Sequence, residues 1–261
     1  MTKLSMFSVL IMLCFASSLF AEVQTKTIPY KQGDIAFEGY MVWDDEVKGK
    51  RPGILVVHEW WGLNDYAKKR CDMLAKQGYV AFAVDMYGKG KVTKHPEQAG
   101  KWMKMIAANV EQWQTRALKG IELLKESEHV DQSKIAAIGY CFGGATVCQL
   151  AYSGADVKAV VSFHGSLPVP TKEQAKKVKA SMLLCHGVAD GFVPEERIIQ
   201  FVDALENGKV DYQFVAYAGA KHGFTNKAAD DAGLDGLAYN EKADKRSWSA
   251  MKKLFREVFA D

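Results

Sequence analysis

A cysteine between glycines is the first candidate for chemistry in this sequence. The apolar run Ile135–Ile138 is followed by Gly139, Cys141 and Gly143, and then by a helical pattern. A strand that turns sharply into a helix presents the residue at the turn, and glycines two positions before and after it avoid collisions with the neighbouring strand and helix. The helix N-terminus beneath the sulfur favours the thiolate, the nucleophilic form of cysteine. Cys141 is therefore a candidate nucleophile, with a buried structural cysteine as the alternative.

An acid and a histidine follow in the order that such a nucleophile requires. Asp190 comes after the apolar run Ser181–Cys185, and His222 comes after Tyr212–Tyr217. A histidine next to the thiol can move its proton, and a carboxylate can hold the imidazole in the correct tautomer. Taken singly, Asp190 is typical of a turn and His222 of a surface histidine. Three such residues in this order, each after a predicted strand, favour a catalytic set.

The cysteines give no sign of a metal centre. Outside the first 21 residues they are Cys71, Cys141, Cys148 and Cys185. None belongs to a CxxC pair, and their spacing lacks the short ligand pairs of a zinc site. We therefore expect no metal site, and the chemistry predicted for Cys141 needs no organic cofactor.

Short apolar runs alternate with helical patterns, which predicts a mostly parallel sheet covered by helices on both faces. The runs are continuous, as expected for strands that are buried on both sides. Two earlier runs, Thr25–Tyr30 and Asp34–Val42, predict an antiparallel lead-in at the sheet edge. The predicted central strands are Ile54–Val57, Val80–Val84, Ile135–Ile138, Val157–Phe163, Ser181–Cys185 and Tyr212–Tyr217.

Helical patterns lie between these strands. They run from Asn64 to Gln77, from Val110 to Glu126, from just after Cys141, from just after Pro194, and through an amphipathic C-terminal segment that includes Trp248 and Phe259. The predicted fold class is a doubly wound α/β sheet. Ligands of such sheets bind at the carboxyl ends of the strands, which is where Cys141, Asp190 and His222 occur.

The first 21 residues have the layout of a secretory signal peptide. Lys3 is the early cation, an apolar run follows it, and small residues from Ala16 to Ser18 precede Ala21. The apolar run is shorter than the ~20 residues that a membrane-spanning helix needs. We therefore expect cleavage after Ala21, with Ser18 as the alternative, and a protein that is periplasmic or secreted and has no stable membrane anchor.

Residues 22–261 are expected to form a single α/β domain, since such folds often reach ~250 residues without dividing. The full chain carries a net charge of +3, with 25% charged and 48% hydrophobic residues, which is an ordinary globular composition. Lysines such as Lys252 and Lys253 are scattered on polar helix faces, so no nucleic-acid partner is expected. A small molecule is the expected partner, and the oligomeric state is left open.

These residues resemble the dienelactone hydrolases, and the likeness covers most of the chain after residue 21. It rests on His58–Asn64, Asp85–Gly88, Gly139–Gly144, the loop around Asp190, and His222–Phe224. The resemblance implies an α/β-hydrolase fold and the hydrolysis of an ester or lactone. It also implies that Cys141 is the nucleophile, with Asp190 and His222 as its acid and base.

The resemblance assigns further roles near the nucleophile. Glu59 matches a glutamate that contacts the resting thiol and helps to deprotonate it when substrate arrives; the alternative is that Glu59 only supports its loop. The backbone N–H groups of Trp60 and Phe142 match the oxyanion hole, where losing one donor typically costs ~10²–10³ in rate.

Aromatic residues in the same loops predict a flat, apolar substrate pocket, although aromatic packing beneath loops is an equally ordinary explanation. The expected substrate-binding residues are Trp61, Tyr87, Lys89, Phe192 and Phe224. Family members that act on an anionic lactone hold its carboxylate with two arginines, and Lys89 and Asn226 occupy the corresponding positions here. Neither offers the arginine fork, so we predict a preference for neutral or differently charged esters and lactones, unless Lys221 turns into the pocket.

Two other classes of function stay open. A hydrolase fold that binds a ligand without turnover would hydrolyse no aryl ester, whereas an enzyme would lose its turnover when Cys141 is changed. A redox-active thiol protein, indicated by export together with several cysteines, would hold Cys141 in a disulfide, and such a disulfide contradicts a hydrolase.

Overall fold

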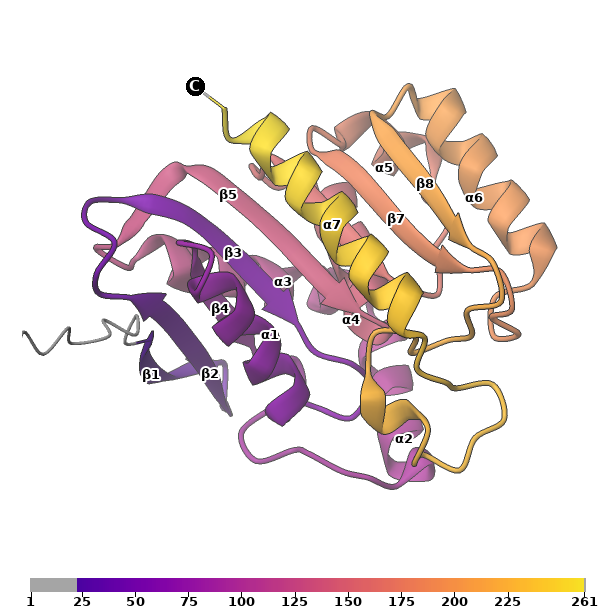
Figure 1. Cartoon of the computed structure of the whole chain (residues 1–261), viewed down its shortest axis with the longest axis horizontal. Coiled ribbons are helices and arrows are strands. Elements are labelled where there is room, and N and C mark those ends of the chain that lie inside the picture. Colours follow the sequence, from indigo (N-terminus) through magenta and orange to yellow (C-terminus); the bar gives the residue numbers. More distant parts are fainter. Residues whose placement is uncertain (1–22, 261) are drawn as a thin grey trace, which may run out of the picture.

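An eight-stranded, mostly parallel sheet runs through the protein (Figure 1). The structure is a computed structural model that describes residues 23–260. The strand order is β1-β2-β4-β3-β5-β6-β7-β8; β2 pairs antiparallel with both β1 and β4, and the remaining pairs are parallel. The strands are β1 (Val23–Gln32), β2 (Ile35–Asp44), β3 (Arg51–Val57), β4 (Val80–Val84), β5 (Val130–Tyr140), β6 (Ala159–Phe163), β7 (Ser181–Gly187) and β8 (Tyr212–Tyr217).

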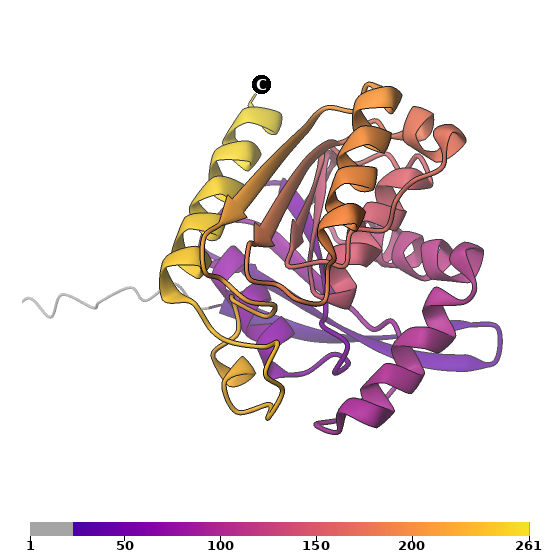
Figure 2. The ribbon, with the colours of Figure 1, turned by 90° about the vertical axis from the view of Figure 1, so that its right-hand side faces the viewer.

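Helices cover both faces of this sheet (Figure 2). α1 and α7 pack on one face, whereas α3, α4 and α6 pack on the other. The helices are α1 (Asp65–Ala75), α2 (Pro96–Ala107), α3 (Val110–Lys125), α4 (Phe142–Tyr152), α5 (Lys172–Lys177), α6 (Glu195–Gly208) and α7 (Glu241–Val258). This arrangement confirms the predicted doubly wound α/β sheet.

The strand order changes direction at β3. β4 pairs with one side of β3 and β5 with the other, so the chain crosses the sheet between these elements. Open α/β sheets bind ligands at the carboxyl ends of the strands beside such a switch point. The residues that follow β3 and β5 here include Glu59 and Cys141.

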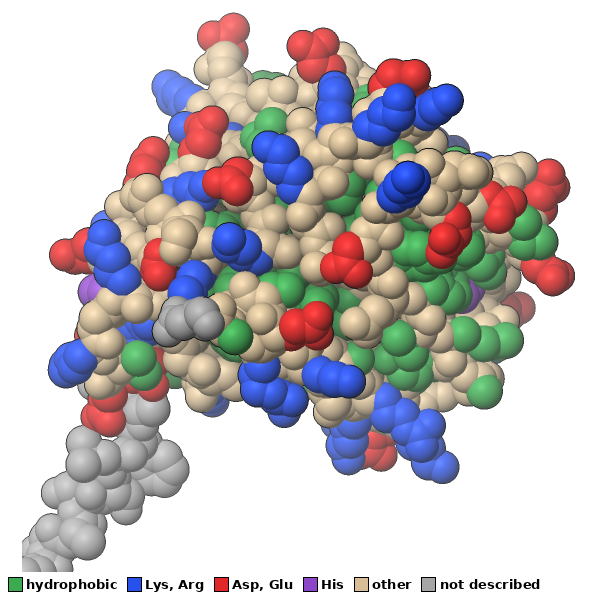
Figure 3. Space-filling view, turned by 90° about the horizontal axis from the view of Figure 1, so that it is seen from above, with side chains coloured by type: hydrophobic (Ala, Val, Ile, Leu, Met, Phe, Trp, Pro, Cys, Tyr) green, Lys and Arg blue, Asp and Glu red, His purple; other side chains and the backbone are tan. Residues whose placement is uncertain are grey.

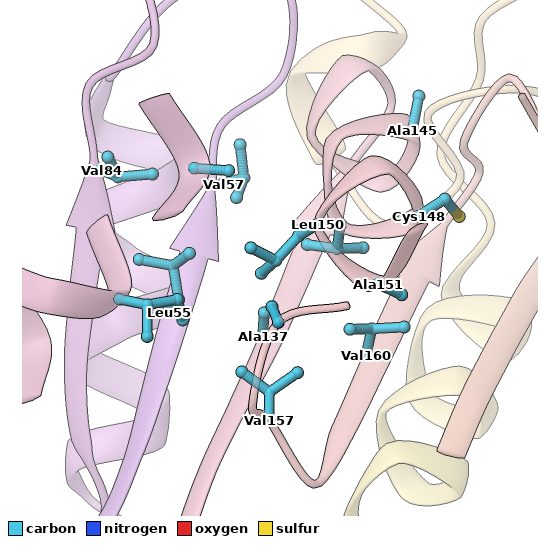
Figure 4. Close-up of a cluster of buried hydrophobic side chains, with 14 of the residues drawn as sticks. Leu55, Val57, Val84, Ala137, Ala145, Cys148, Leu150, Ala151, Val157 and Val160 are labelled. Atoms are coloured by element: carbon cyan, nitrogen blue, oxygen red, sulfur yellow. The ribbon is translucent and has the colours of Figure 1, made fainter. Parts of the chain in front are cut away.

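The strands are buried on both faces, which explains their continuous apolar runs. All residues of β4 and β6 are buried. Full burial of one large aliphatic side chain stabilises the fold by ~1.5–3 kcal/mol relative to exposure. Cys148 of α4 belongs to the same buried cluster as Leu150 and Val160 (Figure 4), as expected for a structural cysteine.

The sequence pattern predicts neither α2 nor α5. α2 buries only Ala99 and Ile106, and its Met103 and Ala107 line a cavity. α5 is six residues long and buries only Ala175. α1 begins at the predicted cap, where the Asn64 side chain accepts the Ala67 N–H.

Lysine and arginine side chains alternate with aspartate and glutamate over the face seen in Figure 3, with hydrophobic side chains between them. No block of one charge dominates this face. Within residues 23–260, no helix combines the length and apolar character needed to span a membrane. The predicted signal peptide, residues 1–21, lies outside the described residues.

Candidate active site

Cys141 lies at the turn between β5 and α4 in a strained backbone conformation. Its φ angle is 55°, in the left-handed region, which costs a residue with a side chain ~1–3 kcal/mol. Close contacts explain the two glycines. A Cβ at Gly139 would lie 2.0 Å from the Gly143 carbonyl oxygen, and a Cβ at Gly143 would lie 2.2 Å from the Val57 carbonyl oxygen. The sharp strand-to-helix turn therefore requires glycine on both sides of the cysteine.

His222 and Asp190 form a buried pair in the loops after β8 and β7. His222 Nδ1 lies 2.8 Å from Asp190 Oδ2, and Asp190 Oδ1 accepts the Phe192 N–H at 3.0 Å. Asp190 is 4% exposed and His222 is 7% exposed. Because Nδ1 is bonded to the carboxylate, Nε2 is the ring nitrogen that remains for a reacting group.

The pKa of His222 rises to about 10 under opposing influences. Burial is the largest of them and lowers the pKa, but the negative charge of Cys141, together with the hydrogen bond and charge of Asp190, outweighs burial. Anions on either side of an imidazole favour its protonated form. The arrangement therefore favours an imidazolium at His222.

Cys141 and His222 line one cavity of about 320 Å³. This volume is at the lower end of the range typical for small-molecule sites. Most of the lining is apolar, and much of it is aromatic. The lining residues are Trp60, Met103, Lys104, Ala107, Trp113, Cys141, Phe142, Ala145, Ser166, Phe192, His222 and Leu237. The cavity suits a small ligand with a flat or apolar part.

Two backbone N–H groups at this cavity lack partners. Within residues 23–260, neither the Trp60 N–H nor the Phe142 N–H donates a hydrogen bond to another group of the protein. Phe142 is the first residue of α4, where helix N–H groups have no acceptor within the helix. Both groups are therefore available to bind an anionic oxygen beside Cys141.

Glu59 is a buried acid that is held by Asn226. Asn226 Nδ2 donates to Glu59 Oε2 at 2.7 Å, and Glu59 is 4% exposed. Burial raises the pKa of Glu59 to about 7, against the opposing influence of the Asn226 hydrogen bond and the charge of His222. Among the described residues, Glu59 accepts this hydrogen bond from Asn226, and no hydrogen bond joins it to Cys141. The contact with the resting thiol that the resemblance implies stays a prediction.

The model of the dienelactone hydrolase family matches residues 37–259. The chain belongs to this family. Two solved structures align with a TM-score of 0.88 and cover 91% of this chain and 99% of their own: m3DLH, at 39% identity, and a dienelactone hydrolase-like promiscuous phosphotriesterase from metagenomic libraries, at 37%. A putative carboxymethylenebutenolidase of Aquifex aeolicus is 28% identical over 234 residues, which are 88% of this chain and 96% of the relative. The chain is thus a dienelactone hydrolase-like ester hydrolase.

The lysines considered for substrate recognition lie away from the cavity lining. Lys89 is exposed and pairs with Glu38 at 2.7 Å. Lys221 Nζ donates to the Asp235 carbonyl oxygen at 2.7 Å. Lys89 is therefore outside the lining of this cavity, and its ammonium group pairs with an acid on β2 at the surface.

Three of the four aromatic residues predicted to bind substrate are also absent from the lining of this cavity. Tyr87 and Phe224 are fully buried, and Trp61 lines a separate pocket of about 400 Å³. Phe192 does line the cavity, is 55% exposed, and places its ring centroid 5.3 Å from that of His222. Packing beneath a loop is an ordinary role for an aromatic residue, and the sequence does not separate it from a place in the pocket.

Several lining residues of this dienelactone hydrolase were not predicted. Met103, Lys104 and Ala107 come from α2, and Leu237 comes from the segment after His222. The available signal for α2 was Pro96 at its first turn. Nothing in the local sequence marks Leu237, which reaches the site because the Ala238 N–H donates to the His222 carbonyl oxygen at 3.1 Å.

The four cysteines within residues 23–260 are free thiols, and three of them, Cys71, Cys148 and Cys185, are buried. Cys141 is the partly exposed one. This arrangement does not support the redox-active alternative to a dienelactone hydrolase, since no disulfide includes Cys141 there. In the same part of the chain, no group of three or more His, Cys, Asp or Glu residues is arranged to hold a metal ion.

Proposed function

We propose that the enzyme cleaves carboxylic esters or lactones with Cys141 as nucleophile, His222 as acid and base, and Asp190 as the residue that orients His222. One observation carries the proposal: a cysteine in a strained turn lines the same cavity as an imidazole that is bonded to a buried carboxylate. Backbone strain of this kind persists only where the surrounding structure imposes it, and it clusters at active sites.

In the first half-reaction, Cys141 Sγ attacks the carbonyl carbon of the substrate. The carbonyl oxygen becomes an oxyanion that accepts hydrogen bonds from the backbone N–H groups of Trp60 and Phe142. The C–O bond then breaks, and His222 Nε2 gives its proton to the leaving alkoxide. The product is a thioester on Cys141; with a lactone, the new alcohol stays attached to the acyl group.

In the second half-reaction, neutral His222 takes a proton from water, and the oxygen attacks the thioester carbonyl. The C–S bond breaks, the acid leaves, and Cys141 returns as a thiolate beside the imidazolium. Asp190 stabilises the protonated His222 in both steps. The cycle needs no metal or organic cofactor.

Glu59 has a supporting part in this proposal. A carboxyl with a pKa of about 7 can exchange a proton with a neighbour at neutral pH. When substrate enters, Glu59 can leave Asn226 and accept the proton of a Cys141 that rests as the thiol. The support for this role is the burial of Glu59 beside His222; Glu59→Ala should slow acylation more than deacylation in stopped-flow measurements.

The test of the proposed function is hydrolysis of a panel of 4-nitrophenyl esters, thioesters and lactones by the purified protein. Cys141→Ala should lower kcat/KM by ~10³-fold or more, since catalytic groups that act together are lost together. Cys71→Ala and Cys148→Ala remove buried thiols outside the cavity and should keep most of the activity. Equal turnover by Cys141→Ala and the parent would contradict the mechanism.

Cleavage of phosphotriesters is a second candidate function. The observation in its favour is the 37% identity to the promiscuous phosphotriesterase over 91% of this chain. Cys141 would attack phosphorus, the aryloxide would leave, and the same oxyanion-binding N–H groups would hold the phosphoryl oxygen. Release of 4-nitrophenol from paraoxon beyond one equivalent, lost in Cys141→Ala, is the expected result. Release that stops at one equivalent would mean that paraoxon inhibits the enzyme and is not turned over.

Export of the protein is also part of the proposal. It rests on Lys3, the apolar run and the small residues before Ala21. The mature protein should begin at Glu22 or close to it. Intact-mass measurement of protein from the extracytoplasmic fraction checks this, and a mass that still includes Met1 to Ala21 would rule out cleavage.

A further inference from the structure

Trp113 forms the floor of the cavity that Cys141 lines. Its side chain is 6% exposed, and its buried neighbour in the lining, Ala145, is 1% exposed. Trp113 belongs to α3 and Ala145 to α4, and these two helices pack against each other. The mouth of the cavity is marked by its exposed lining residues, Lys104, Ala107, Ser166 and Phe192. A substrate that enters there meets the indole as the innermost wall.

A chain of hydrogen bonds fixes the indole of Trp113. Its Nε1–H donates to Thr146 Oγ1 at 2.7 Å, and the Thr146 hydroxyl donates to the Phe142 carbonyl oxygen at 2.8 Å. The indole also stacks on the Phe142 ring, with an interplanar angle of 6° and 5.4 Å between the ring centroids. Rotation of the indole would leave its buried N–H without a partner, which is unfavourable. Trp113 is therefore a rigid wall.

The proposed mechanism determines which part of an ester reaches this wall. His222 gives its proton to the leaving alkoxide, so the alcohol part lies beside His222, where Phe192 and Leu237 complete the lining. The carbonyl oxygen faces the two backbone N–H groups beside the sulfur. The acyl chain is the remaining substituent of the carbonyl carbon. It points away from both and toward the floor formed by Trp113 and Ala145.

We propose that Trp113 limits the length of the acyl group and makes the enzyme selective for esters of short-chain acids. The cavity of about 320 Å³ has to hold the reacting carbonyl as well as the chain. One methylene more or less in an apolar pocket changes kcat/KM by ~10–200-fold. Trp113 contacts the acyl chain and takes no part in the bond changes. This inference rests on the proposed function, in which Cys141 carries the acyl group.

The test compares 4-nitrophenyl butanoate with 4-nitrophenyl octanoate. Trp113→Leu keeps the wall apolar and shortens it. We expect the parent to favour butanoate at least about tenfold in kcat/KM, and Trp113→Leu to reduce that preference about tenfold, chiefly through faster octanoate hydrolysis. Thr146→Val removes the hydrogen bond that holds the indole and keeps the ring. It should reduce the preference in the same direction and by less.

Trp102→Leu is the matched control. Trp102 lies on α2 with its ring centroid 5.7 Å from that of Tyr87, and it is absent from the cavity lining. The variant loses the same indole and should keep the preference of the parent for butanoate. The proposal is overturned by an unchanged preference in Trp113→Leu, by an equal loss of activity on both esters in that variant, or by the same change in Trp102→Leu.

Alkyl methanethiosulfonates probe the same wall without turnover. Such a reagent transfers an alkylthio group to the Cys141 sulfur and releases methanesulfinate, and peptide mass gives the rate. The propyl reagent should label the parent at least about tenfold faster than the octyl reagent, and Trp113→Leu should narrow that difference. An unchanged rate ratio in Trp113→Leu would overturn the proposal for Trp113. Labelling as predicted, without hydrolysis of any ester, would support it and overturn the proposed function alone.

Discussion

Glu59 is expected to make the stability of the folded protein depend on pH. Its pKa rises from 4.5 to about 7 on folding, chiefly because the carboxyl is buried. The folded protein therefore keeps the proton over a range in which the unfolded chain has lost it. The free energy of unfolding should decrease as pH rises from about 4.5 to about 7, because the buried carboxyl must then ionise.

Glu59→Gln tests this statement, since glutamine keeps the shape and can still accept from Asn226 Nδ2. The free energy of unfolding of the variant, minus that of the parent, should increase by about 1–3 kcal/mol when the pH rises from 4.5 to 8. The size follows from the shift in pKa, since one pKa unit corresponds to ~1.36 kcal/mol. Urea unfolding at the two pH values measures the gain. Glu38→Gln, at an exposed acid paired with Lys89, gives the baseline for losing a carboxylate. An equal difference between Glu59→Gln and parent at both pH values would contradict the burial argument.

Residue spacing predicted the geometry of some site residues and not of others. The glycines around Cys141 and the order of Asp190 and His222 are dictated locally, by a tight turn and by strands that end at one edge. The positions of Lys89 and Tyr87 depend on which partners the fold supplies, an acid on β2 for one and the ring of Phe142 for the other. Those partners are distant in sequence, so local spacing does not reveal them.

At the scale of elements, α2 forms one wall of the cavity and brings a charge to it. Lys104 is the lysine among the lining residues, beside Met103 and Ala107. No arginine is among these lining residues, and a single exposed ammonium on an otherwise apolar wall holds a carboxylate weakly. The predicted preference for neutral esters therefore stays in place, with Lys104 as the source of any tolerance for an anion.

The charge prediction is tested with a neutral ester and its carboxylate-bearing analogue. We expect kcat/KM to be about tenfold higher for the neutral ester, and Lys104→Met to lower kcat/KM for the anionic ester about threefold more than for the neutral one. Lys101→Met lies on the same helix and changes a lysine paired with Glu97 at 2.8 Å, so it should leave the ratio unchanged. A strong preference of the parent enzyme for the anionic ester would contradict the proposal that the cavity favours neutral esters.

The helices differ in how well the sequence predicts them. α1, α3, α4, α6 and α7 pack on the sheet and carry buried stripes. α2 buries two residues, as α6 does, and its Met103 and Ala107 line the cavity. The number of buried residues therefore does not separate α2 from the predicted helices.

At the scale of the whole molecule, the buried strands determine where the chemistry can occur. Continuous apolar runs predicted the parallel sheet, because only strands covered on both faces have such runs. The order β4-β3-β5 then brings Glu59 and Cys141 to one edge, and β7 and β8 deliver Asp190 and His222 to the same edge. The strand order depends on which face of the sheet each connecting helix covers. No single segment of the sequence reveals that order.

The acyl-enzyme is the species that tests the central claim most directly. Purified protein is mixed with a slowly hydrolysed 4-nitrophenyl ester, quenched in acid during the first turnover, and examined by intact mass and peptide mapping. The account predicts an added acyl mass on the peptide that contains Cys141, linked as an acid-stable thioester and absent from Cys141→Ala. An acyl group on another side chain, or full turnover by Cys141→Ala, would contradict it.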